Sequence, residues 1–322
     1  MKTRTIPRTN LNAAVLFLGT AGFGSALDDL VSVAILDRYL KAGGNGLDTA
    51  EVYAEWVPGG SHRSEELIGR WLRERKSREG VILSTKGAHP RIDSMHVPRM
   101  SRREVEADLN SSLQRLSVDH VDLYWLHRDD PNRPVEEILL MLADFRRAGK
   151  IRYAGLSNWT QPRAEAARLA AEKLNLPGFI GIQNQWSLAK ADRSKGDPTA
   201  AYIDESFIKW HTKHGFAAFA YSPQANGYFR RLEQGTIDQA SDLVKGLFHH
   251  VTNQRRYERI KELQQQTGYS QGQIVLGYLL SQHFPVFPII GPNKIADLED
   301  SLEASDITLT SEQLKFLTAE FQ

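Results

Sequence analysis

The stretch "SRREVEADLNSSLQRLSVDHVDLYWLH", residues 101–127, holds a helix pattern followed at once by a strand pattern. Ser101 is a favourable N-cap, and Glu104, three residues later, is suited to complete a capping box. Apolar residues then recur at helical spacing, at Val105, Leu109, Leu113 and Leu116. The run "VDLYWLH" that follows is short, apolar and rich in strand-forming residues. This stretch therefore predicts one helix and one buried strand of an α/β fold.

The same alternation recurs along the whole chain. Helix patterns appear in "ELIGRWLRERK" (66–76), in "PVEEILLMLADFRRAGK" (134–150), which opens on Pro134 and closes towards Gly149, and in "GQIVLGYLLSQ" (272–282). Eight runs read as strands: 15–19, 45–49, 81–86, 121–127, 152–157, 179–184, 216–222 and 285–291. Eight such units predict a parallel sheet, and eight is the number that closes a (β/α)8 TIM barrel.

An open doubly wound sheet is the alternative fold. It is disfavoured because the glycines of "LGTAGFGSALDD" (18–29) do not have the G-x-G-x-x-G spacing of a dinucleotide-binding turn. We therefore predict a single α/β barrel domain over residues 1–322, with long loops at the carboxyl ends of its strands. One long segment, from Pro223 to about Arg255, shows no strand pattern, and long loops in compact folds often carry function.

Composition excludes several classes of function. The chain has 322 residues, 41% of them hydrophobic and 25% charged, and a formal net charge of +1. This balance gives no sign of a nucleic-acid partner. With no cysteine, disulfides and thiolate nucleophiles are excluded. The N-terminal apolar run is too short to span a membrane and has no convincing cleavage site, so we expect a cytoplasmic protein without a membrane partner. The sequence does not indicate the number of subunits.

Polar residues stand at the ends of the predicted strands. Asp48, Lys86 and His127 each close an apolar run, and Tyr53 follows Asp48 by five residues. Later strands end in Ser157, Asn158, Gln183, Asn184, Tyr221 and Ser222. Taken singly, such residues are more often structural: an aspartate cap, a solvated lysine or a satisfied core histidine. Taken together they indicate a site, because catalytic groups of a barrel lie at the carboxyl ends of its strands.

A carboxylate, an ammonium, a phenol and an imidazole form a coherent set for proton transfer. A phenol titrates near pH ~10, which makes it a weak acid for protonating a carbonyl. A neighbouring ammonium favours the phenolate and lowers that pKa, and a carboxylate keeps a buried lysine charged. The imidazole can hold a substrate oxygen. The set predicts proton transfer to an oxygen, coupled to a second event at its carbon.

Several motifs resemble the aldo-keto reductase superfamily, over nearly the whole chain. They are "GLDTAEVY" (46–53), "SEELIGRWL" (64–72), "ILSTK" (82–86), "DLNSSLQRLSVDHVDLYWLH" (108–127), "GKIRYAGLSNW" (149–159), "FAYSP" (219–223) and "IIGPNKIADLEDSLEA" (289–304). The variants "DTAEVYAEWVPGGSHRSEE" and "YWLHRDD" are most similar to bacterial members of uncertain substrate. The resemblance implies that Tyr53 is the general acid, Lys86 tunes it, Asp48 holds Lys86 and His127 orients the carbonyl.

The resemblance also implies a nicotinamide cofactor. Ser157, Asn158 and Gln183 match positions that bind the carboxamide, and Tyr221 matches the aromatic that stacks on the nicotinamide ring. The loop "SPQANGYF" resembles the pyrophosphate loop, and the segment 291–301 would hold the adenosine end. The cofactor residues expected beyond these four are Gly19, Thr20, Ser222, Pro223, Gln224, Gly227, Gly291, Asn293, Lys294, Asp297, Asp300 and Ser301.

The sequence gives opposing indications for NADP(H) and NAD(H). The resemblance to the family favours NADP(H), but Asp297 stands where many members that bind the 2′-phosphate have Arg or Gln. A carboxylate there would repel a phosphate, or accept a hydrogen bond from a free ribose hydroxyl, while Lys294 could offset it as a point charge. The alternative is that Asp297 only caps a helix. NAD(H) therefore stays open beside NADP(H).

Candidate substrate contacts follow the strand ends or lie in the long segment. They are Trp56, Arg128, Trp159, Tyr228 and Phe229. Aromatic walls with Arg128 suit a polar, ring-shaped or sugar-like substrate. Trp125 should belong to the barrel core, because it lies two residues before His127 on the same strand face. The insertion 89–101 is expected to cover the site, and a metal site on His89 and His96 is disfavoured because no third ligand is near.

We therefore expect an NAD(P)(H)-dependent oxidoreductase that reduces an aldehyde or ketone, possessing no metal site and binding a small carbonyl or alcohol. Two alternatives stay open. One is an NAD-dependent sugar dehydrogenase that works in the oxidising direction. The other is a nicotinamide-binding regulatory subunit with little turnover, as some relatives act beside ion channels.

Overall fold

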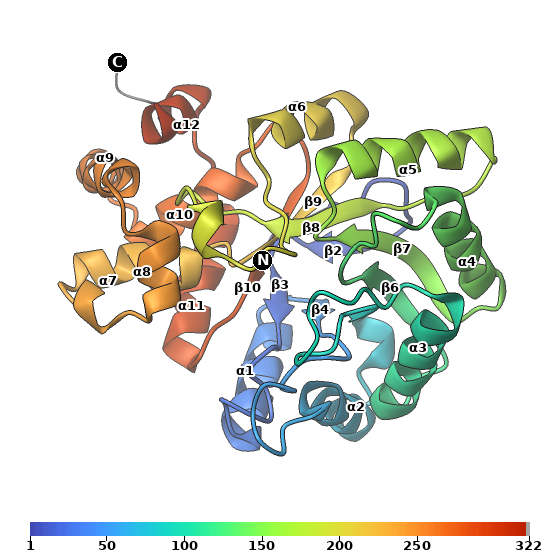
Figure 1. The fold of residues 1–322 in the computed structure, drawn as a ribbon. Helices are drawn as coiled ribbons and strands as arrows, with labels where there is room; N and C mark the ends of the chain where they lie inside the picture. The colour runs from blue at the N-terminus through green and yellow to red at the C-terminus, as the bar shows by residue number, and fades with distance from the viewer. Residues whose placement is uncertain (320–322) are drawn as a thin grey trace.

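Eight parallel strands close into a barrel in the computed structural model, which describes residues 1–319 (Figure 1). Each strand pairs with its neighbours in chain order, and the last strand closes on the first of the eight. The strands are β3 (Phe17–Gly19), β4 (Gly46–Asp48), β5 (Ile82–Gly87), β6 (Val121–Leu126), β7 (Ile151–Ser157), β8 (Gly181–Gln185), β9 (Ala217–Tyr221) and β10 (Val286–Ile290). They coincide with the eight predicted runs, so the predicted (β/α)8 barrel is confirmed.

Helices surround this barrel (Figure 1). They are α1 (Asp29–Lys41), α2 (Arg63–Arg75), α3 (Arg102–Leu116), α4 (Val135–Arg147), α5 (Gln161–Lys173), α6 (Glu205–His214), α7 (Tyr228–Glu233), α8 (Asp242–Phe248), α9 (Val251–Thr267), α10 (Gln271–Leu280), α11 (Ile295–Glu303) and α12 (Ser311–Thr318). Within residues 1–319, no helix combines the length and the apolar character that crossing a bilayer requires.

Local sequence signals set the helix ends where they were expected. In α3, the side chain of Ser101 accepts from the backbone N–H of Glu104. The side chain of Glu104 in turn accepts from the backbone N–H of Ser101, which completes the capping box. Val105, Leu109 and Leu116 of the predicted stripe are buried against the barrel. Pro134 is the N-cap of α4, and Gly149 just beyond its end has a left-handed φ of 73°.

The end of the barrel where its strands begin is closed by a hairpin that the sequence did not predict. Its strands, β1 (Thr3–Thr5) and β2 (Asn12–Ala14), pair antiparallel. Three side chains of this segment, Ile6, Leu11 and Ala13, pack on the inner barrel core. That core includes Trp125, which is fully buried as expected. Strands of three residues are too short to show an alternating pattern, which explains why they were missed.

The long segment after β9 is largely helical, which corrects the expectation of a long loop. It contains the short helices η3 (Ala225–Gly227) and η4 (Ile237–Gln239) as well as α7 and α8. Helices α7, α8 and α9 lie together at the left of Figure 1. Runs of three to seven residues are too short to be recognised as helices by periodicity. The segment places Arg230 of α7 against Asp297 of α11.

Candidate active site

Four predicted catalytic residues meet at the carboxyl ends of three adjacent strands. Asp48 is the last residue of β4, Lys86 is the next to last of β5, and His127 follows β6. The backbone N–H of Glu51 donates to the carbonyl of Lys86 (3.0 Å), which turns the chain after β4 back over the barrel end. This turn brings Tyr53 above Lys86. The expected grouping of these residues at one rim is therefore what the structure shows.

All three hydrogens of the Lys86 ammonium are used. Its Nζ donates to Asp48 Oδ2 at 2.6 Å, to the backbone oxygen of Thr49 at 2.8 Å and to Tyr53 Oη at 2.8 Å. The side chain is only 1% exposed. Since an ammonium is a donor only, the Tyr53 oxygen accepts this bond and the phenol keeps its own hydrogen for another partner.

Asp48 is held on both of its oxygens. Besides the bond from Lys86 to Oδ2, its Oδ1 accepts from Ser84 Oγ (3.0 Å) and from Gln183 Nε2 (3.0 Å). Ser84 in turn accepts from Trp125 Nε1 at 2.7 Å. The carboxylate is thus fixed by strands on opposite sides of the barrel interior. Gln183, expected as a nicotinamide contact, also positions Asp48.

The resting phenol is firmly protonated. Burial raises the pKa of Tyr53 well above its usual value, and the Asp48 carboxylate raises it further, while the Arg128 guanidinium acts in the opposite direction. An ammonium 2.8 Å from the phenol oxygen also favours the phenolate. The expected effect of Lys86, which favours the phenolate, therefore opposes the effect of burial.

Burial disfavours the charged forms of the other two bases as well. It lowers the pKa of Lys86, and the Asp48 carboxylate acts in the opposite direction. Burial also holds the pKa of His127 well below its usual value, with smaller effects from His89 and Arg128. His127 is therefore a neutral imidazole, and its Nδ1 has no hydrogen-bond partner among the described residues. A neutral imidazole offers one donor and one acceptor nitrogen.

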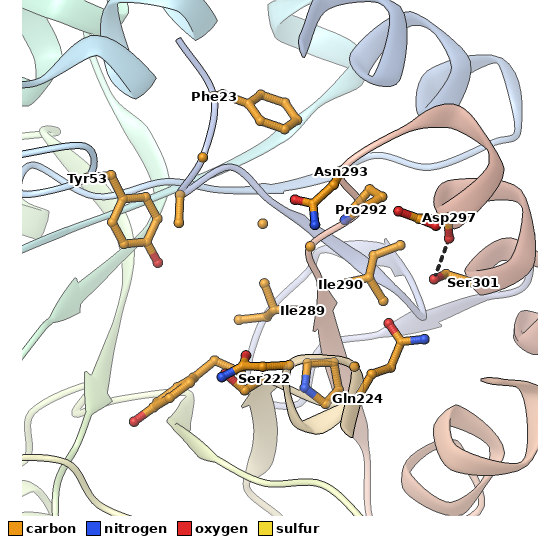
Figure 2. Close-up of a pocket in the computed structure, with 18 of the residues that line it drawn as sticks. Phe23, Tyr53, Ser222, Gln224, Ile289, Ile290, Pro292, Asn293, Asp297 and Ser301 are labelled. Carbon is orange, nitrogen blue, oxygen red and sulfur yellow. Dashed lines mark hydrogen bonds between the residues drawn. The ribbon is translucent and has the colours of Figure 1, made fainter. Parts of the chain in front are cut away.

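A cavity of about 850 Å³ extends from this group to α11. Figure 2 shows Tyr53 at one end and Asp297 with Ser301 at the other, with Ser222 and Gln224 along one side between them. Of the predicted cofactor residues, all except Thr20 line the cavity: Gly19, Ser157, Asn158, Gln183, Tyr221, Ser222, Pro223, Gln224, Gly227, Gly291, Asn293, Lys294, Asp297, Asp300 and Ser301. Thr20 lies behind them, fully buried, with its hydroxyl donating to the backbone oxygen of Asp48.

The middle of the cavity is organised around Asn158. Its side-chain nitrogen donates to the His127 carbonyl at 3.1 Å, and its oxygen accepts from Tyr221 Oη at 2.7 Å. The residue has a left-handed φ of 59°. Asn158 therefore links His127 to the tyrosine that was expected to stack on a nicotinamide. Any contact of Asn158 with a carboxamide would share or replace these bonds.

The far end of the cavity carries several charges. Asp297, near the start of α11, accepts from Arg230 Nη1 of α7 at 2.7 Å. Lys294, the N-cap residue of α11, has no side-chain bond to the helix end, so backbone N–H groups there are not capped by it. Arg230, Arg231 and Gln234 also line the cavity and were missed. The basic run "YFRRLE" directly after the predicted pyrophosphate loop was the available signal.

Two of the five predicted substrate residues line the cavity. Trp56 is 51% exposed at its mouth, with its ring 6.1 Å from that of Tyr53. Arg128 donates to Thr199 and Asp197, both at 2.9 Å, and to the His127 carbonyl at 3.0 Å. These bonds fix the orientation of its guanidinium, which lines the cavity with a positive charge.

The other three predicted substrate residues lie outside the cavity. Trp159, Tyr228 and Phe229 are almost fully buried, with at most 1% exposed. Arg163 covers the ring of Trp159, Tyr228 and Phe229 pack on each other, and Tyr228 also packs on Phe248 of α8. Their aromatic surface fills the core between helices, so we no longer count them as substrate contacts.

His89 lines the cavity beside His127 and was not predicted as a substrate contact. It begins the insertion expected to cover the site. Within residues 1–319, no group of three or more His, Asp or Glu side chains could hold a metal ion. The remaining unpredicted lining is mainly apolar, and includes Phe23, Ile289 and Ile290.

Comparison with known proteins agrees with this geometry. The model of the aldo/keto reductase family matches residues 15–319. The chain belongs to this family. Such aldo-keto reductases are oxidoreductases that use nicotinamide cofactors, and the chain is similar over nearly its whole length to several of them.

Three relatives illustrate the range of proteins similar to this aldo-keto reductase. An uncharacterized oxidoreductase, YrpG of Bacillus subtilis (strain 168), is 28% identical over 98% of this chain and 95% of its own. The NADP(+) aryl-alcohol dehydrogenase of Phanerodontia chrysosporium is 26% identical, over 97% and 83%. A probable voltage-gated potassium channel subunit beta of Arabidopsis thaliana is 25% identical, over 95% and 92%.

A solved structure supports the fold. The crystal structure of a thermostable aldo-keto reductase in complex with the inhibitor epalrestat superposes with a TM-score of 0.73. It is 27% identical in sequence and covers 99% of both chains.

Proposed function

We propose that this aldo-keto reductase reduces an aldehyde or ketone to an alcohol with NADP(H), using Tyr53 as the general acid. The arrangement of Lys86 carries the proposal. Its three hydrogens are committed to Asp48, to the Thr49 carbonyl and to the Tyr53 oxygen. The phenol hydrogen is therefore the proton available to a substrate oxygen in the cavity.

The proposed step combines two bond changes at one carbonyl. A bound nicotinamide supplies the hydride that reaches the carbonyl carbon. Tyr53 donates its proton to the carbonyl oxygen as that oxygen gains charge, and the resulting phenolate is balanced by the Lys86 ammonium. His127, neutral and beside Tyr53, orients the carbonyl oxygen through a ring N–H. In alcohol oxidation the same phenolate would accept the proton.

The cavity has groups suited to each part of NADP(H). The Tyr221 ring would face the nicotinamide. The backbone around Ser222, Gln224 and Gly227 would hold the pyrophosphate. At the far end, the uncapped start of α11, with Lys294, suits a phosphate group because backbone N–H groups point outward there.

The Arg230–Asp297 pair supports NADP(H) over NAD(H). The guanidinium neutralises the carboxylate that sequence alone suggested would repel a 2′-phosphate. A relative named as an NADP(+) aryl-alcohol dehydrogenase points the same way. NAD(H) is the second choice, because the preference for NADP(H) depends on the Arg230–Asp297 ion pair, which is partly exposed.

A turnover assay with a matched variant tests the proposal. The purified protein is mixed with NADPH or NADH and a panel of aldehydes and ketones, and the loss of nucleotide absorbance is followed. Tyr53→Phe should lower kcat by about 10³-fold, since a positioned general acid contributes about 10²–10⁴-fold. It should leave the dissociation constant for NADPH within about twofold, because the Phe ring keeps the shape of the wall.

Two results would contradict the proposal. One is the absence of turnover for every carbonyl with both nucleotides, and the other is full activity of Tyr53→Phe. Tight NADPH binding without turnover would instead favour a regulatory subunit, the class suggested by the relative named as a probable channel beta subunit. Turnover only of sugars with NAD would favour the dehydrogenase alternative.

A further inference from the structure

A second histidine lies against the catalytic one inside the cavity. The His89 and His127 rings meet edge to face, with their centroids 4.7 Å apart. The Tyr53 ring lies 6.0 Å from that of His127 on the same cavity wall. His89 is 7% exposed. It therefore reaches the space next to the point where Tyr53 and His127 would hold a carbonyl oxygen.

The position of His89 is fixed by its neighbours. Its backbone oxygen accepts from Arg99 Nη1 at 3.0 Å, and Arg99 also pairs with Asp108 at 2.7 Å. The same Asp108 accepts from the backbone N–H of Ala88 at 2.9 Å, where the chain has a left-handed φ of 63°. These three bonds, two of them to the Asp108 carboxylate, thus hold the chain on both sides of His89. The imidazole is presented on a rigid support, as binding sites require.

The hydrogen bonds of the ring define what it offers to a ligand. Its Nδ1 lies 2.6 Å from the carbonyl oxygen of Pro90, which can only accept, so Nδ1 carries the hydrogen. Burial, assisted by Arg128, lowers the pKa of His89 to about 4, so the ring is neutral near neutral pH. Its Nε2 is then an acceptor, and it has no hydrogen-bond partner among the described residues.

The charged group of the surrounding wall offers no acceptor. Arg128 presents only donors, and each of its three nitrogens already makes a bond to the protein. Tyr53 and His127 direct hydrogens at the carbonyl oxygen in the proposed reaction. A substrate hydroxyl beside that carbonyl needs an acceptor for its hydrogen, and the unpaired Nε2 of His89 offers one.

We propose that His89 binds the hydroxyl group on the carbon next to the reacting carbonyl, so that this aldo-keto reductase selects α-hydroxy aldehydes and ketones over their deoxy analogues. The inference rests on the proposed carbonyl reduction and adds a substrate class to it. Trp56 at the mouth of the cavity fits the same class, because an aromatic face packs well against the C–H face of a polyhydroxylated chain or ring.

A pair of substrates with the same carbon skeleton tests this inference. Lactaldehyde and propanal differ only by the hydroxyl next to the aldehyde. The wild type should show a kcat/KM ratio for lactaldehyde over propanal of about 10 or more, since a site built to bond a hydroxyl discriminates strongly against its absence. His89→Leu should lower that ratio about 3- to 10-fold, mainly through KM for lactaldehyde, as expected for one lost hydrogen bond.

Two further variants separate recognition from structure. His89→Gln keeps an acceptor oxygen and should restore at least half of the lost preference. His96→Leu removes an exposed imidazole from the same segment and should leave the ratio unchanged. Thermal melting and NADPH binding of each variant show that the fold and cofactor site are intact.

The outcomes are distinguishable from failure of the proposed function. Equal loss for lactaldehyde and propanal in His89→Leu would assign His89 a structural role and overturn the inference, while carbonyl reduction stands. An unchanged ratio in His89→Leu would overturn it in the same way. Absence of wild-type turnover with every carbonyl would refute carbonyl reduction, and the inference with it.

Discussion

The two ends of the cavity are built differently. At the catalytic end, Lys86 and Asp48 are 1% and 2% exposed in their side chains, and each of their polar atoms is hydrogen-bonded within the barrel. At the adenosine end, Arg230 and Asp297 are 43% and 18% exposed and make a single ion pair between two helices. The catalytic end is organised before any ligand binds, whereas the other end presents charges that water and salt screen.

The two ends should therefore respond unequally to the loss of one partner. A buried ion pair costs much when broken, because the remaining charge keeps its burial without its compensation. A partly exposed pair costs little, because water solvates the remaining charge. The following experiments compare the ends on these grounds.

Lys86→Met should have the largest effect on stability. It leaves the Asp48 carboxylate buried, with Ser84 and Gln183 as its remaining side-chain donors among the described residues. We expect the free energy of unfolding to fall by about 3–5 kcal/mol, measured by urea denaturation. Activity should also be lost, because the phenolate of Tyr53 would have no cation beside it.

A double-mutant cycle gives the control for this experiment. Asp48→Asn removes the charge but keeps the shape, and Lys86→Met with Asp48→Asn should recover part of the stability lost by Lys86→Met alone. Additive losses in the double variant would show that the two side chains are not energetically coupled, which would contradict the description of Lys86 and Asp48 as a buried ion pair.

The catalytic end should also give stability a defined dependence on pH. Burial lowers the pKa of His89 to about 4 from its ordinary value near 6.5. Between these values the unfolded chain binds a proton that the folded protein does not, so stability is full above about pH 6.5 and falls as the pH drops towards 4. His89 should contribute a loss of about 1–2 kcal/mol between pH 7 and pH 5.

The contribution of His89 to the pH dependence of stability is isolated by comparing the wild type with a variant that lacks the imidazole. Urea unfolding of the wild type and His89→Gln at both pH values removes the effects of the other titrating groups, which the two proteins share. The variant should lose less stability than the wild type over this interval. An equal loss in both proteins would mean that His89 is not held neutral in the fold.

The same contrast explains what could be predicted from sequence. The grouping of Asp48, Lys86 and His127 could be predicted because each stands at or beside the end of an apolar strand, and a parallel barrel brings strand ends together. The eight strands were predicted for the same reason, since each is a local pattern. Neither prediction required knowledge of a side-chain direction.

Other features depend on contacts that no local pattern encodes. The burial of Trp159 after β7 depends on packing under Arg163, so it could not be predicted from the position of Trp159 in the sequence. Arg230 and Asp297 are 67 residues apart and meet only through the placement of α7. The acceptor role of His89 depends on the carbonyl of Pro90 and on the clamp by Arg99 and Asp108.

Arg230→Ala should have the smallest effect, and it tests the adenosine end directly. Because the pair is partly exposed, the free energy of unfolding should change by less than about 1 kcal/mol. Without the guanidinium, Asp297 faces a 2′-phosphate with its charge uncompensated. The dissociation constant should then rise about 3- to 10-fold for NADPH and less than about twofold for NADH, measured by fluorescence titration at low salt.

Asp297→Asn is the matched control for this variant. It leaves the Arg230 guanidinium without its carboxylate partner and should tighten NADPH binding, with little change for NADH. Raising the salt concentration should reduce both effects, because screening weakens charges that reach water. Equal changes for the two nucleotides would show that the Arg230–Asp297 pair only stabilises the packing of α7 on α11. The choice of nucleotide would then depend on Lys294 or on the start of α11.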